Sequence, residues 1–64
     1  MELETKDIIK KKLLDAQESV RDYQCYSKRI DDNPELAVLF KEFAEESAMQ
    51  ARKLQQVLTS YEEN

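Results

Sequence analysis

The sequence predicts an all-α protein, an antiparallel hairpin of two long helices that spans residues 1–64 as a single domain. Apolar residues recur at steps of three and four in both halves of the chain, which is the spacing of a helix that buries one stripe. The only proline lies near the midpoint, and the chain contains no glycine. Because tight β-hairpin turns and phosphate-binding loops ordinarily require glycine, the composition argues against both.

The first helix is expected over about residues 5–31. Its predicted buried stripe consists of Ile9, Leu13, Ala16, Val20, Tyr23, Ser27 and Ile30. Glu4 and Asp7 lie at its N-terminal end, where acidic side chains complement the helix dipole. The stripe continues for three heptads, so the sequence predicts a helix much longer than the average of about 11–12 residues.

A short turn is expected around Asn33 and Pro34. Asparagine is a favoured N-cap and proline is favoured in the first helical turn, so the second helix should begin here and run over about residues 34–61. Proline disfavours helical conformation in the preceding residue, so the first helix should end by Asp31 or Asp32. Asparagine can also take the left-handed conformation in a turn without glycine.

The second helix carries a stripe with two polar members, Ser47 and Gln50, which we expect to face inward. The predicted stripe is Leu36, Phe40, Phe43, Ser47, Gln50, Leu54, Val57 and Tyr61, widened by Leu39, Ala44, Ala51 and Leu58. Simple antiparallel pairing places Ser47 level with Ser19 or Val20. The sequence therefore predicts a small polar layer near the middle of the hairpin.

Each predicted helix also carries a second line of residues beside its stripe. These lines are Ile8, Lys12, Ser19 and Tyr26 on the first helix, and Ala37, Ala44, Ala48 and Ala51 on the second. One copy of so short a chain supplies only about 3–5 kcal/mol from its core, and a lone hairpin leaves such flanks open. We therefore expect a homo-oligomer, a two-fold symmetric dimer that forms a four-helix bundle. The predicted interface residues are Tyr23, Tyr26, Phe40, Phe43, Leu54 and Tyr61.

Residues 33–54, with the sequence NPELAVLFKEFAEESAMQARKL, resemble the second helix of a ferritin-like, rubrerythrin-type hairpin. Residues 13–19, with Tyr23 and Tyr26, resemble the first helix of that family more loosely. The resemblance implies a ferritin-like four-helix bundle, in which a Glu from one helix and a Glu-x-x-His from the other hold a di-iron site. Ser47 stands at the position of that second Glu and Gln50 at the position of the His. The helix-one Glu corresponds to Glu18 or Ser19, so the resemblance implies a lost metal site and no cofactor.

These observations predict a non-enzymatic assembly or interaction module that packs with itself or with a larger ferritin-like protein. Histidine, the commonest general base and transition-metal ligand, is absent. Two alternatives stay open. Acidic residues at Glu42, Glu45, Glu46, Glu18 and Asp22 leave a carboxylate-only divalent-metal or iron-binding protein as the first alternative.

The second alternative is a small dimeric RNA-binding hairpin that uses Lys6 and residues 10–12, the only basic run. Ten Lys and Arg against 14 Asp and Glu give a net charge of −4, which argues against a surface that neutralises phosphates. We therefore do not expect nucleic acid as a partner.

A cytoplasmic location is expected, with no membrane association. No segment has the length and apolarity of a signal peptide or a membrane span. The single cysteine, Cys25, cannot form an internal disulfide, and we expect it to act as a small apolar residue near the surface.

Overall fold

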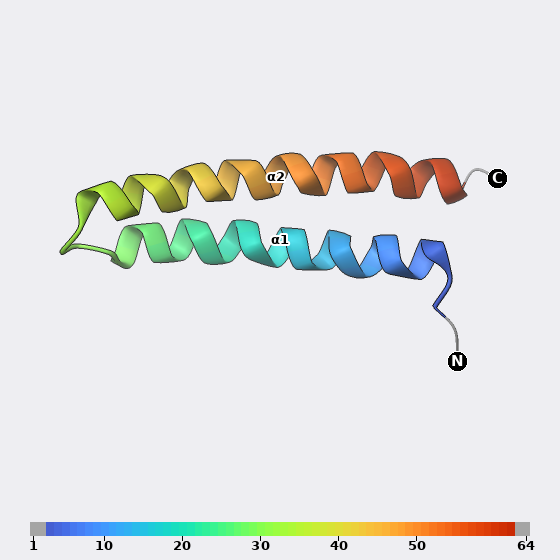
Figure 1. Ribbon diagram of the computed structural model, residues 1–64, viewed down its shortest axis with the longest axis horizontal. Coiled ribbons are helices and arrows are strands. Elements are labelled where there is room, and N and C mark those ends of the chain that lie inside the picture. The colour runs from blue at the N-terminus through green and yellow to red at the C-terminus, as the bar shows by residue number, and fades with distance from the viewer. Residues whose placement is uncertain (1–2, 63–64) are drawn as a thin grey trace.

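The computed structural model describes residues 3–62, which form two α-helices packed side by side in antiparallel directions (Figure 1). Helix α1 is Thr5–Arg29 and helix α2 is Pro34–Glu62. The connection between them lies at one end of the long axis, and the start of α1 and the end of α2 lie at the other end. The predicted helical hairpin is therefore confirmed.

Helix α1 begins where the sequence predicts and ends earlier. At its start, the backbone N–H of Glu4 donates to Oδ2 of Asp7 at 3.4 Å. At its end, Ile30 is extended, with φ −76° and ψ 107°, although its N–H still donates to the carbonyl of Tyr26. The predicted end at residue 31 is thus two residues too late, because the reversal between the helices uses all four residues from 30 to 33.

Asn33 caps helix α2 through its side chain. Its Oδ1 accepts a hydrogen bond from the N–H of Leu36 at 3.1 Å, which satisfies one of the free donors of the first turn. The predicted start at Pro34 is confirmed. No residue of the described range 3–62 has a positive φ, so the turn does not use the left-handed conformation that asparagine permits.

We expect Asn33→Ala to lower the free energy of unfolding by about 1 kcal/mol, because the Leu36 N–H loses its acceptor. In a domain of this size that loss lowers the melting temperature by about 4–8 °C, as measured by circular dichroism. Asn33→Ser should retain most of the stability. Asp32→Ala is the matched control in the same exposed turn, and an equal loss in this variant would argue against the cap.

The two helices contact each other through different side chains at the two ends of the hairpin. Near the termini, a core of Ile9, Leu13 and Leu58 is supported by the half-buried Ala51 and Leu54. Near the turn, Tyr23 packs edge-on against Phe40 with ring centroids 5.3 Å apart, and its centroid lies 5.4 Å from that of Phe43. The predicted stripe of α1 is confirmed, because each of its seven residues is buried or half-buried.

The predicted stripe of α2 is rotated from the observed one. The residues of α2 that are buried or half-buried are Ala37, Phe40, Phe43, Ala44, Ser47, Ala48, Ala51, Leu54 and Leu58. Leu36, Leu39, Gln50, Val57 and Tyr61 are exposed, so the prediction that they belong to the stripe is wrong. The predicted and observed patterns have the same spacing, and the prediction is confirmed for the other seven of its twelve residues. The observed one turns the small alanine side chains toward α1, where they allow the two helices to approach closely.

Neither helix of the described hairpin has the length and apolarity needed to cross a bilayer.

Candidate functional site

The hairpin has two broad faces, and one of them carries an open groove. The groove runs between the helices along Gln17, Val20, Arg21 and Gln24 of α1 and Lys41, Glu45, Ala48, Arg52 and Gln55 of α2. We call this side the groove face. Apolar side chains such as Val20 and Ala48 lie in the groove, and long polar or charged side chains lie along it on both helices.

The opposite side carries large apolar side chains, which we call the apolar face. Its members are Ile8 and Tyr26 of α1 and Leu36, Leu39, Val57 and Tyr61 of α2, with exposed fractions of 37–48%. Ile8 and Tyr26 are 18 residues apart, which is five helical turns, and so they project from the same side of α1. Leu39 and Val57 have the same relation on α2.

Helix geometry places the groove face and the apolar face on opposite sides of the hairpin. Gln17 follows Ile8 by nine residues, and Ala48 follows Leu39 by nine residues. Nine residues are two and a half turns, so each pair projects from opposite sides of its helix. The half-buried rings of Tyr23 and Phe43 lie between the exposed apolar side chains of α1 and those of α2. These rings join the apolar face to the aromatic cluster near the turn.

The hairpin leaves a large part of its apolar side chains in solvent. Within the described residues, the buried hydrophobic set is Ile9, Leu13, Ala16, Ala44 and Leu58, and no side chain is less than 2% exposed. Ten large hydrophobic side chains are exposed. Single exposed apolar residues are normal on protein surfaces, but a contiguous set on one face is typical of an interaction site.

The six predicted interface residues lie in two places, on the apolar face and in the contact between the two helices. Tyr26 and Tyr61 lie on the apolar face, each 48% exposed. Tyr23, Phe40, Phe43 and Leu54 are half-buried against the other helix. The sequence analysis did not place Leu36 and Leu39 on a free surface, although Leu39 and Val57 are five whole turns apart and so project from the same side of α2.

The positions that match the di-iron ligands do not form a metal site. Ser47 is 8% exposed and faces α1, and Ser19 is half-buried. Gln50 and Glu18 are exposed, so the prediction that Gln50 faces inward is wrong. The only buried position of the four therefore offers a hydroxyl and no carboxylate, and the residues present do not fit a di-iron centre.

The other candidate groups lie on the surface. Glu42, Glu45 and Glu46 are exposed, as are Glu18 and Asp22. Across residues 3–62, no group of three or more His, Cys, Asp or Glu side chains is placed to hold a metal ion. A carboxylate-only metal site therefore has no geometric support in this part of the chain.

The free thiol of Cys25 is exposed, in agreement with its expected place near the surface. The basic run is exposed as well, and Nζ of Lys12 lies 3.4 Å from Oδ2 of Asp15. Three successive lysines point in three directions around a helix, so residues 10–12 present no single basic patch.

No protein-family model, curated protein or solved structure matches the chain. The ferritin-like, rubrerythrin-type resemblance rests on residues 13–26 and 33–54 alone, and it stays a prediction.

Proposed function

We propose that this chain is a non-enzymatic assembly module in which two hairpins pair through their apolar faces to form a four-helix bundle. The observation that carries the proposal is the exposure of Ile8, Tyr26, Leu39 and Val57 on one side of the hairpin. Burying these side chains against a like surface removes apolar area from water at about 25 cal/mol per Å². A second copy supplies such a surface without any further partner.

The shape of the hairpin supports this pairing. Its radius of gyration is 14.8 Å, whereas a compact domain of 64 residues has about 11 Å. It measures 48 × 24 × 12 Å, so a broad face has a projected area of about 1,150 Å². A stable interface needs about 800 Å² per partner, so a broad face of the hairpin is large enough to provide one.

The ferritin-like character of the bundle and its cytoplasmic location are parts of the same proposal. The resemblance of residues 33–54 supports the first of these, and Ser47 and Gln50 are the reason that we propose assembly without metal chemistry. A larger ferritin-like protein that presents two helices could take the place of the second copy. We propose the homodimer because it requires no surface other than the apolar face of this chain.

The proposal is tested by measuring mass and melting temperature as functions of protein concentration. We expect sedimentation equilibrium to give a mass of about 15 kDa, twice the 7.6 kDa of one copy. Because unfolding then separates two chains, each tenfold increase in concentration should add about 1.4 kcal/mol to the stability of the dimer and raise its melting temperature. A 7.6 kDa species with a melting temperature that does not change over a 100-fold range of concentration would exclude the homodimer.

A further inference from the structure

We infer that the two hairpins pack with their turns at opposite ends of the bundle, so that charges of opposite sign meet along the borders of the apolar faces. This inference rests on the proposed dimer and specifies its geometry. Two hairpins stacked face to face by a two-fold axis have two possible arrangements. An axis along the helices places both turns at one end and α1 over α2 of the second copy. An axis across the helices places the turns at opposite ends, with α1 over α1 and α2 over α2.

The level of each residue along the bundle follows from the hairpin itself. Tyr23 contacts Phe40 and Phe43, and α2 begins at Pro34 after α1 ends at Arg29, so residues whose numbers add to about 65 lie level with each other. The midpoints of Thr5–Arg29 and Pro34–Glu62 are residues 17 and 48, and an axis across the helices at this level gives the two apolar faces full overlap. From these levels, the neighbours across each possible interface can be assigned.

The apolar residues are compatible with both arrangements. With the turns at opposite ends, Ile8 lies level with Tyr26 of the second copy, and Leu39 with its Val57. With the turns at the same end, Ile8 lies level with Val57 of the second copy, and Tyr26 with its Leu39. Since every pair is apolar in either case, the charged residues must decide.

Four exposed charged side chains on or beside the apolar face, Lys12, Asp22, Glu42 and Lys53, favour opposite ends. Lys12 also pairs with Asp15 of its own helix, with Nζ 3.4 Å from Oδ2. With the turns at opposite ends, Lys12 lies level with Asp22 of the second copy, and Lys53 lies level with its Glu42. With the turns at the same end, Lys12 instead lies level with Lys53 of the second copy and Asp22 with its Glu42. Each pairing occurs twice in a symmetric dimer, so one arrangement has four attractive pairs where the other has four repulsive ones.

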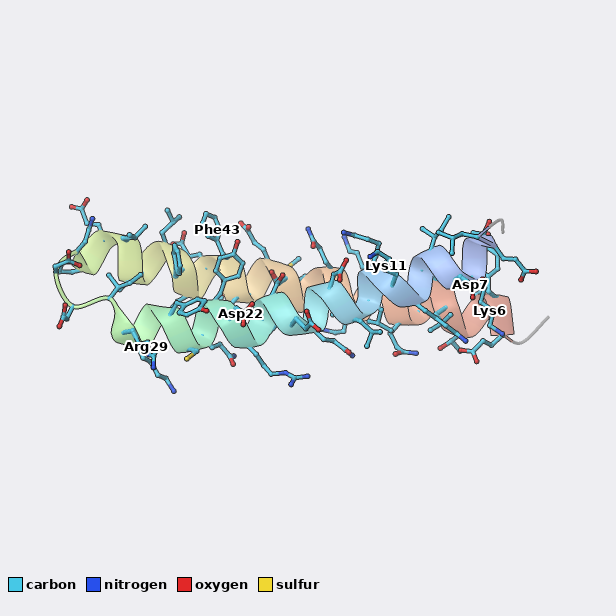
Figure 2. The ribbon with its side chains drawn as sticks, turned by 90° about the horizontal axis from the view of Figure 1, so that it is seen from below. Lys6, Asp7, Lys11, Asp22, Arg29 and Phe43 are labelled. Atoms are coloured by element: carbon cyan, nitrogen blue, oxygen red, sulfur yellow. The ribbon has the colours of Figure 1, made fainter. Side chains whose placement is uncertain are left out.

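The charge of the hairpin as a whole points the same way. The half that contains the turn, residues 18–47, has four basic and eight acidic residues, a net charge of −4. The other half, residues 1–17 and 48–64, has six basic and six acidic residues, a net charge of 0. In Figure 2, Lys6, Asp7 and Lys11 lie toward the terminal end, and Asp22 and Arg29 lie toward the turn. Packing with the turns at opposite ends keeps the two acidic halves apart.

Reversing the charge of Lys53 tests the arrangement by the sign of its effect. With the turns at opposite ends, Lys53→Glu faces Glu42 of the second copy and should weaken the dimer about tenfold at low salt. With the turns at the same end, the new carboxylate faces Lys12 and should tighten the dimer. Dissociation constants from sedimentation equilibrium measure this effect, which should shrink at high salt because these exposed charges are screened.

Two further variants complete the experiment. Adding Glu42→Lys to Lys53→Glu should restore the original affinity, because the pair is then inverted and again attractive. Arg52→Glu is the matched control, since Arg52 neighbours Lys53 but lies on the groove face, and we expect its dimer affinity to be unchanged. A tighter dimer or no change for Lys53→Glu would overturn the inferred arrangement and leave the dimer standing. A chain that is monomeric before any substitution would instead overturn the proposed function.

Cross-linking gives an independent measurement of the same geometry. In a Cys25→Ser background, a mixture of the Lys12→Cys and Asp22→Cys chains should form cross-linked dimers with a short thiol-reactive linker. A mixture of the Lys12→Cys and Lys53→Cys chains should not. The reverse result would show that both turns lie at the same end.

Discussion

Leu58→Ala is expected to remove about 2–5 kcal/mol of unfolding free energy per copy. Leu58 is 6% exposed and joins Ile9 and Leu13 in a buried cluster near the terminal end of the described hairpin. Truncation removes its contacts and leaves a cavity that two rigid helices fill poorly. A single core of this size supplies only about 3–5 kcal/mol, so most of the helical signal in circular dichroism should be lost at room temperature in dilute protein.

Leu14→Ala is the matched control for this substitution. It deletes the same atoms from the same type of residue, but Leu14 is 61% exposed. We expect its unfolding free energy to change by no more than about 0.5 kcal/mol. Equal losses in the two variants would contradict the observed packing of the helices.

The two helices differ in how well the sequence predicts their buried sides. In α1, apolar residues recur at steps of three and four along the whole helix on one stripe only, because the neighbouring line of Ile8 and Tyr26 is interrupted by Lys12 and Ser19. In α2, two stripes one residue apart both contain apolar residues, one rich in alanine and one containing Leu36, Val57 and Tyr61. Periodicity alone cannot choose between them, because the choice depends on how closely the partner helix approaches.

The boundaries of the helices depend on local chemistry to different degrees. Asn33 and Pro34 fix the start of α2 because a side-chain acceptor and a fixed φ act within one turn of the helix. The end of α1 has no comparable signal, and it is set by the number of residues needed to cross to α2. The number of residues in this connection depends on how the two helices pack against each other, so the sequence of α1 alone does not determine it.

The position of the apolar face depends on the same choice between the two stripes of α2. If the stripe that contains Gln50 faced α1, a polar pair would lie inside the hairpin and Val57 and Tyr61 would be buried. Choosing the observed stripe moves Gln50 to the surface and exposes Val57 and Tyr61. The residues available for assembly could therefore be identified only once the rotation of α2 was known.

Leu39→Lys is expected to weaken the proposed dimer by at least about 100-fold, which corresponds to about 3 kcal/mol. Leu39 lies on the apolar face and is level with Val57 or Tyr26 of the second copy in the two possible arrangements. The result therefore does not depend on which of them forms. Each dimer contains the substitution twice, and each lysine both removes an apolar contact and places a charge where water is excluded.

Val38→Lys provides the comparison that isolates the interface. Val38 is 55% exposed and precedes Leu39 by one residue, so it projects from the outer side of α2. Lysine is a better helix former than valine, and this variant should keep the dimer and its stability. Sedimentation equilibrium over a range of concentrations should thus give a monomer for Leu39→Lys at concentrations where Val38→Lys is dimeric. If both variants associate equally well, the interface lies elsewhere than on the apolar face; if both dissociate, the effect comes from added charge and not from the position of Leu39.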